Sequence, residues 1–263
     1  MKKNGYKLLF ALAVLLLVAI EVAGRTVRTE SPLFPIAETV ASRLIGALVF
    51  VPLIRRMGYP VLGAGRFSRD RGNPDRMEWA VLVLSVLVTV NNFPWIGILS
   101  GRARITAGPE VVAFFAVECI VVGCFEELAF RGFLLPYCFG ITKGKPGSAF
   151  RAVFLSSAVF GLVHLVNLFS GASPAAVLMQ IGYSFLVGGM CGCVLLATGS
   201  VWICAALHAV YNFCGTLLSR YGEGIRWDPV TVVFTSVLAV LASAVCLVWL
   251  LKTDPPVDGL RGE

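Results

Sequence analysis

Polar and ionisable side chains interrupt the apolar stretches of this sequence at three places. These side chains, with the neighbours that matter to them, are Glu126, Glu127 and Arg131; Phe160 and His164; and His208 and Asn212. A charge at the centre of a membrane helix costs about 2.5 to 3.5 kcal/mol, so such residues usually face a bundle interior or a wet cavity. The two histidines are the only ones in the chain, and both are candidates for proton transfer.

The paired glutamates are expected to face in different directions. Glu127 and Arg131 are four residues apart, so on a helix they share one face and can form an ion pair. Glu126 is rotated by about 100° from its neighbour, which leaves its carboxylate free to act as a general base. The alternative is that both glutamates neutralise Arg131 and serve the architecture alone.

The histidines offer two further chemical groups. Phe160 lies one helical turn before His164 and is expected to pack against its ring, although a lone histidine on an apolar face is often a core residue. His208 and Asn212 share a helix face and can both donate hydrogen bonds to one point, which suits a developing oxyanion. The alternative for that pair is a hydrogen bond between helices.

The elements that must position these groups are membrane helices. The 263 residues are 57% hydrophobic and 14% charged, whereas soluble domains are about 25% charged. A membrane helix needs about 20 apolar residues. Eight stretches approach that length, at residues 6–23, 34–54, 79–99, 110–138, 150–169, 174–197, 200–219 and 229–251. The sequence therefore predicts an all-α integral membrane protein with about eight transmembrane helices and a single polytopic domain over residues 1–263.

Three other features concern the packing of these helices. Gly188 and Gly192 form a small-xxx-small pattern, which favours close helix packing. We interpret Asn91 and Asn92 as hydrogen-bonding groups at a helix end, with the lining of a cavity as the alternative. The eight cysteines fall in or beside apolar segments and are expected to be small buried hydrophobes.

Lysine and arginine residues predict the orientation, because they concentrate in cytoplasmic loops. With the N-terminus inside, fourteen of them fall on the cytoplasmic side, namely Lys2, Lys3, Lys7, Arg55, Arg56, Arg66, Arg69, Arg71, Arg76, Lys143, Lys145, Arg151, Lys252 and Arg261. Six fall outside, namely Arg25, Arg28, Arg102, Arg104, Arg220 and Arg226. We therefore expect a multi-pass protein of the cell membrane with both termini cytoplasmic. The net charge of +7 indicates contact of these loops with anionic lipid rather than binding of nucleic acid.

Three motifs resemble those of the CPBP family of intramembrane proteases. They are E-E-x-x-x-R at 126–131, F-x-x-x-H at 160–164 and H-x-x-x-N at 208–212, each on its own hydrophobic helix and in that order. The family contains CaaX prenyl endopeptidase-like, ABI and bacteriocin-processing membrane proteases. The resemblance covers a core at residues 110–219 and implies an eight-helix fold with a conical cavity open to membrane and water.

The resemblance also implies catalytic roles for these residues. Glu126, aided by His164, would activate a water that attacks the scissile carbonyl. His208 and Asn212 would hold the oxyanion. The supporting residues would be Glu127, Arg131 and Phe160. This mechanism requires no cofactor.

A zinc-dependent mechanism is the alternative to it. Glu126, His164 and His208 can supply a site of two histidines and one carboxylate with an open position for water. No H-E-x-x-H motif is present, and Asn212 is a poor zinc ligand. We therefore expect a mechanism without a cofactor, with zinc at the three former residues as the alternative.

The expected function is that of an intramembrane endopeptidase acting on a membrane-associated peptide or protein. In bacteria, the family suggests bacteriocin maturation, immunity or the processing of peptide signals. One alternative is a non-catalytic immunity or scaffold protein with the same fold. Another is a small proton-coupled transporter in which Glu126, His164 and His208 relay protons. Such transporters contain internal repeats, and none is found in this sequence.

The predicted topology can be tested by cysteine accessibility on a cysteine-free background. A cysteine introduced within residues 60–75 should react only from the cytoplasmic side, and one within residues 170–174 only from outside, because the basic loops stay in the cytoplasm. Labelling of the 60–75 loop from outside alone would overturn this orientation.

Overall fold

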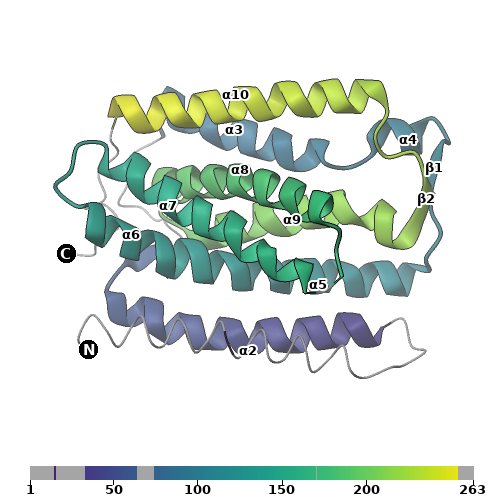
Figure 1. Cartoon of the computed structure of the whole chain (residues 1–263), viewed down its shortest axis with the longest axis horizontal. Coiled ribbons are helices and arrows are strands. Elements are labelled where there is room, and N and C mark those ends of the chain that lie inside the picture. Colours follow the sequence, from purple (N-terminus) through teal and green to yellow (C-terminus); the bar gives the residue numbers. More distant parts are fainter. Residues whose placement is uncertain (1–14, 16–32, 64–73, 170, 254–263) are drawn as a thin grey trace.

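The computed structural model describes residues 15, 33–63, 74–169 and 171–253. Its long helices lie side by side in a bundle, and a two-stranded sheet lies at one end (Figure 1). The α-helices are α2 (Phe34–Met57), α3 (Arg76–Asn91), α4 (Trp95–Leu99), α5 (Pro109–Glu127), α6 (Leu135–Thr142), α7 (Ser148–Val163), α8 (Pro174–Thr198), α9 (Val201–Tyr221) and α10 (Pro229–Thr253). The other elements are the 3-10 helices η1 (Pro60–Leu62) and η4 (His164–Leu168), the π-helix η3 (Leu128–Leu134), and the strands β1 (Ala103–Ile105) and β2 (Gly222–Gly224).

Five of the described helices are long and apolar enough to cross a membrane. They are Phe34–Met57, Ser148–Leu168, Pro174–Thr198, Val201–Tyr221 and Pro229–Lys252. Each corresponds to a predicted segment, and the all-α membrane fold class is thereby confirmed. The predicted segment 6–23 lies outside the described residues.

The predicted segment 79–99 is interrupted in the structure. α3 ends at Asn91, because Pro94 has no N–H for a helical hydrogen bond and restricts the residue before it. At the other end, Asp75 and Glu78 form a capping box that fixes the start of α3. α3 therefore has only 16 residues, and the short α4 follows the break.

The predicted segment 110–138 forms a continuous helical path that carries both candidate glutamates. α5 ends at Glu127, and η3 leads directly into α6, which ends at Thr142. A π-helix is an uncommon element that often marks a functional site. Because η3 begins directly after Glu127, it changes the direction in which the following side chains face.

Glycines allow the helices that carry the polar groups to approach one another. A Cβ at Gly123 of α5 would lie 2.9 Å from the carbonyl oxygen of Ala205 and 3.0 Å from the nitrogen of Ala209 on α9. A side chain does not fit at such distances, so glycine lets α5 pack directly on α9. In α8, a Cβ at Gly192 would lie 3.0 Å from Val153 Cγ1 of α7, which agrees with the predicted small-residue packing face.

The two-stranded sheet joins the start of α5 to the end of α9. β1 pairs antiparallel with β2, with Ala103 opposite Gly224. Gly224 has a φ of +109°, and a Cβ there would collide with the carbonyl oxygen of Arg102. Arg104 and Glu223 form an exposed ion pair across the strands, with a hydrogen bond of 2.6 Å. The sheet thereby positions the connection between β2 and α10.

We expect Gly123→Ala to destabilise the protein by about 1–3 kcal/mol, because the added methyl group is forced against the backbone of α9. Gly182→Ala is the matched control, since a Cβ at Gly182 of α8 would meet no atom within 4 Å. Thermal unfolding of both purified variants in detergent provides the comparison. Equal transition temperatures for the two variants would contradict direct packing of α5 on α9.

Candidate active site

The three sequence motifs lie on helices that pack against one another. α5 and η3 carry Glu126, Glu127 and Arg131; α7 and η4 carry Phe160 and His164; and α9 carries His208 and Asn212. α5 packs on α9, and α7 contacts η3. Three of the ionisable side chains are almost completely enclosed, with exposures of 0% for Glu127, 1% for Arg131 and 5% for His208.

Glu127 binds two donors through one oxygen. Its Oε1 accepts a hydrogen bond of 2.9 Å from Arg131 Nη1 and one of 2.7 Å from His208 Nδ1. The predicted pair of Glu127 and Arg131 is therefore present, and His208 joins it. A carboxylate that faces an arginine only accepts hydrogen bonds, so Nδ1 of His208 carries the proton in this contact.

His208 bridges the two glutamates. Its Nε2 lies 3.3 Å from Oε2 of Glu126. Because Nδ1 already carries a proton, one further proton must lie between Nε2 and Glu126 for the contact to be attractive. That proton makes either an imidazolium that faces a carboxylate or a carboxylic acid that faces a neutral imidazole. We refer to this proton, which the contact requires, as the shared proton of Glu126 and His208.

Glu126 is the more open of the two glutamates. Its side chain is 21% exposed, and its Oε1 has no hydrogen-bond partner among the described residues. An accessible carboxylate oxygen beside a histidine is the arrangement that general-base activation of a water requires.

Phe160 packs against the polar groups from one side. Its buried ring stands edge-on to the ring of His164 at 5.3 Å and to that of His208 at 5.8 Å, measured between centroids. The guanidinium carbon of Arg131 lies 4.5 Å from the centre of the same ring, which is a cation–π contact. A Cβ at Gly188 would lie 3.2 Å from Phe160 Cδ1, so this glycine lets α8 cover the ring. The predicted packing of Phe160 on His164 is present.

His164 and Asn212 lie outside this hydrogen-bonded network. Nδ1 of His164 donates to the carbonyl oxygen of Phe160 at 2.9 Å, so Nε2 carries the lone pair of the neutral ring. The half-buried amide of Asn212 makes no hydrogen bond with a described residue. Within the described part of the chain, no hydrogen bond or ion pair joins either residue to Glu126 or His208. Each therefore keeps a polar group available to a water or a substrate.

Glu126, His164 and His208 do not form a set of zinc ligands. Among the described residues, no three histidine, cysteine, aspartate or glutamate side chains lie close enough together to hold one metal ion. Nδ1 of His208 donates to Glu127, and Nε2 faces Glu126, so of the three candidates Glu126 and His208 alone are oriented towards a common point.

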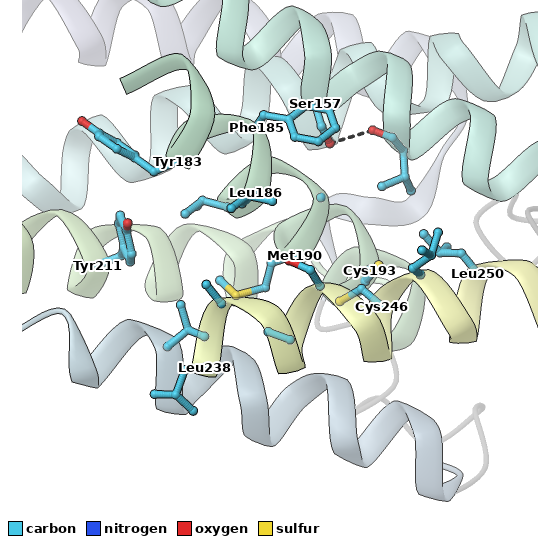
Figure 2. Close-up of a pocket in the computed structure, with 18 of the residues that line it drawn as sticks. Ser157, Tyr183, Phe185, Leu186, Met190, Cys193, Tyr211, Leu238, Cys246 and Leu250 are labelled. Carbon is cyan, nitrogen blue, oxygen red and sulfur yellow. Dashed lines mark hydrogen bonds between the residues drawn. The ribbon is translucent and has the colours of Figure 1, made fainter. Parts of the chain in front are cut away.

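A largely apolar cavity of about 230 Å³ lies next to the site. Residues of α3, α7, α8 and α10 line it, together with Tyr211 of α9. Figure 2 shows Tyr183 and Tyr211 towards one end of the cavity and Cys246 and Leu250 towards the other. Tyr183 interacts electrostatically with Glu126, so the tyrosine end is the end near the candidate base.

Asn91 and Asn92 contribute to this cavity. Asn91 Nδ2 donates to Thr235 Oγ1 of α10 at 2.9 Å, and Asn92 Nδ2 donates to the carbonyl oxygen of Tyr211 at 2.9 Å. Both residues line the cavity. The structure therefore favours the lining of a cavity over hydrogen bonding at a helix end. Both amides donate to neighbouring helices rather than to the end of α3.

The segment that carries the candidate catalytic residues matches a known protein family. Residues 108–214 match the type II CAAX prenyl endopeptidase Rce1-like family. The match confirms the family resemblance, and the Rce1-like segment includes every candidate residue from Glu126 to Asn212. No curated protein and no solved structure gives a significant match to the chain. The family is one of proteases, which supports a peptidase on a membrane-spanning fold.

The contact of His208 with the two glutamates is the feature of this site that the sequence does not predict. Spacing along α9 groups His208 with Asn212, whereas the structure pairs His208 with residues of α5. This contact depends on the approach of α5 to α9 at Gly123. A single glycine in an apolar helix signals a close contact, but it does not identify the helix that makes it.

Glu127→Gln and Glu126→Gln form a matched pair of substitutions on adjacent residues. Glu127→Gln leaves Arg131 and His208 without their carboxylate in a closed site, so we expect a loss of about 3–5 kcal/mol in stability. Arg131→Gln should behave like Glu127→Gln, and Glu126→Gln should accumulate normally. Membrane abundance and thermal unfolding in detergent are the measurements. Normal stability of both Glu127→Gln and Arg131→Gln would show that this ion pair does not hold the fold.

Proposed function

We propose that this protein is an intramembrane endopeptidase of the CPBP type, which hydrolyses a peptide bond in a membrane-associated peptide or protein. The observation that carries the proposal is the contact of His208 with both Glu126 and Glu127 inside a segment that matches a protease family. A non-catalytic scaffold needs the ion pair of Glu127 and Arg131, but it has no need of a second, accessible glutamate that shares a proton with a histidine.

Glu126 acts as the general base in this proposal. When the shared proton lies on His208, Glu126 is a carboxylate with Oε1 free. That oxygen takes a proton from a water as the water oxygen attacks the scissile carbonyl carbon. His164 helps to orient the same water through the lone pair on its Nε2.

Donors near Glu126 stabilise the tetrahedral intermediate. Asn212 donates a hydrogen bond from its amide to the oxyanion, and His208 donates from Nε2–H once Glu126 has become a neutral acid. The proton on Glu126 then passes to the leaving nitrogen as the C–N bond breaks, which yields a carboxylic acid and an amine and restores the carboxylate. Glu127 holds the His208 ring in place throughout.

The membrane setting completes the proposal. The protein resides in the cell membrane with both termini in the cytoplasm, and its basic loops contact anionic lipid. The apolar lining of the cavity suits a hydrophobic stretch of the substrate. Hydrolysis then takes place at the polar end of that cavity, near Glu126.

Glu126→Gln keeps the size of the side chain but cannot take a proton from water near neutral pH. We expect this variant to reach the membrane and to lose at least about 100-fold in cleavage rate, the lower end of a general base's contribution. A reconstituted cleavage assay scored beside membrane abundance is the measurement. Full activity at normal abundance would end the proposed mechanism and favour the scaffold alternative.

The other two candidate groups should give graded losses. His164→Ala should reduce the rate to an extent similar to Glu126→Gln, because it removes the second group that orients the water. Asn212→Ala should cost about 10²–10³-fold, as the loss of one oxyanion donor does. The losses from Glu126→Gln and His164→Ala should not add in the double variant, since residues that act as a unit fail together. Additive losses would assign the two side chains to separate steps.

Metal removal distinguishes this mechanism from the zinc alternative. We expect cleavage to continue after dialysis against EDTA and 1,10-phenanthroline, because Glu126 and His164 activate the water without a metal. Total metal in the purified protein, measured by mass spectrometry, provides the independent control. Loss of activity that returns on addition of zinc would overturn this part of the proposal.

A further inference from the structure

The chain changes from one helical form to another at His164. α7 ends at Val163, and the 3-10 helix η4 begins at His164. The backbone N–H of His164 bonds to the carbonyl oxygen of Gly161, three residues back, whereas in an α-helix it would bond to that of Phe160. The carbonyl oxygen of Phe160 is thereby free to accept from the imidazole Nδ1 of His164. The tighter turn therefore lets the backbone orient this ring.

Little packing holds η4 in this form. None of its five residues is buried, and the exposed fractions are 44% for Leu165, 38% for Val166 and 41% for Leu168. A 3-10 turn has poorer hydrogen-bond geometry than an α-helical turn. The conformation of η4 therefore depends on whatever other contacts the segment makes with the rest of the bundle.

One side-chain hydrogen bond joins η4 to α8. Nδ2 of Asn167 donates to Oε1 of Gln180 at 2.8 Å, and both side chains are half-buried. Within the described part of the chain, no other side-chain hydrogen bond joins η4 to a helix other than α7. The backbone carbonyl oxygen of Asn167 also accepts from the N–H of Ala172 at 3.2 Å. Asn167 thus closes the end of η4 and links it to a neighbouring helix.

His164 and Asn167 lie on the same face of η4. A 3-10 helix has three residues per turn, so side chains three positions apart eclipse each other and are separated by about 6 Å along the axis. These two are the half-buried residues of η4, whereas the other three are exposed. The hydrogen bond of Asn167 therefore fixes the face that presents the imidazole.

α8 provides a firm support for this bond. A Cβ at Gly161 of α7 would lie 2.9 Å from the carbonyl oxygen of Ile181, so α7 packs directly on α8 just before η4 begins. About two turns after Gln180 along α8, Gly188 lies against the ring of Phe160. The helix that holds η4 is therefore the same helix that covers the polar network of the site.

We propose that Asn167 and Gln180 are positioning residues, whose hydrogen bond keeps η4 in the 3-10 form and so orients Nε2 of His164 towards the water. The inference rests on the proposed endopeptidase function. Without this bond, η4 relaxes towards an α-helix, and the backbone N–H of His164 takes the carbonyl oxygen of Phe160 from the imidazole. A single hydrogen bond between membrane helices contributes little to stability, so its loss affects the reaction more than the fold.

Cleavage kinetics test the effect of this bond on the reaction. Gln180→Ala should lower kcat by about 10-fold or more with little change in KM, because a displaced group beside the reacting atoms costs rate rather than binding. The same change should cost nothing further in the His164→Ala protein, since residues that act as a unit fail together.

Two further proteins serve as a rescue and a control. The exchange of Asn167→Gln with Gln180→Asn keeps two amides and their combined length, and it should recover most of the rate. Met179→Ala changes the neighbour of Gln180, whose side chain is 72% exposed, and it should keep the wild-type rate.

The ring ¹⁵N signals of the two histidines give a readout that needs no peptidase activity. In the Gln180→Ala protein, the Nδ1 signal of His164 should shift, because the imidazole has lost its bond to Phe160. The signals of His208 should stay in place, since α9 does not depend on η4. A bond that serves the bundle alone would leave both histidines unchanged or move both together.

Three results would overturn the inference: His164 signals that stay unchanged or move together with those of His208, a loss of rate that adds fully to that of His164→Ala, or failure of both Gln180→Ala and Asn167→Ala to accumulate. Asn167→Ala takes the place of Gln180→Ala in each measurement if the latter alone fails to accumulate. A selective shift of His164, together with a wild-type protein that cleaves no peptide, would support the positioning role and count against the proposed function alone.

Discussion

The site depends on a single atom, Oε1 of Glu127, which accepts hydrogen bonds from both Arg131 and His208. Arg131 makes the buried carboxylate tolerable inside a membrane bundle, because neither charge would be stable there alone. The same carboxylate fixes which nitrogen of His208 carries a proton and turns the other nitrogen towards Glu126. In the proposed mechanism, the ion pair of Glu127 and Arg131 therefore also orients the catalytic groups.

The helix packing around this atom follows from a few small residues. Gly123 lets α5 approach α9 closely enough for Glu127 to reach His208, and Gly188 lets α8 cover Phe160 and Arg131. Larger residues at either position would move a helix and lengthen hydrogen bonds that depend on sub-ångström placement. Beside this network, the bundle leaves the apolar cavity, which residues of α3, α7, α8 and α10 line. Tight packing at the polar network and open space beside it are what a hydrolytic site in a membrane requires.

Much of the fold and part of the site could be predicted from the sequence. Membrane helices follow from long apolar stretches, and the pair of Glu127 and Arg131 follows from local spacing, because contacts four residues apart on one helix depend on nothing else.

The π-helix η3 has no sequence signature of its own. The sheet pairs Ala103 with Gly224, residues far apart in the chain, so strands of three residues could not be foreseen. The contact of His208 with the glutamates of α5 could not be predicted from the sequence either, since it depends on which helices become neighbours.

The protonation of His208 is the most direct test of this account. The chain has two histidines, so labelling with ¹⁵N-histidine yields two sets of ring signals, and a His164→Gln protein assigns them. We expect Nδ1 of His208 to carry a proton in a short hydrogen bond to Glu127. We expect the Nε2 signal to change in the Glu126→Gln protein, because an amide, unlike a carboxylate, cannot take up the shared proton. An unprotonated Nδ1, or an Nε2 signal that ignores the substitution of Glu126, would contradict the arrangement on which the proposed catalysis rests.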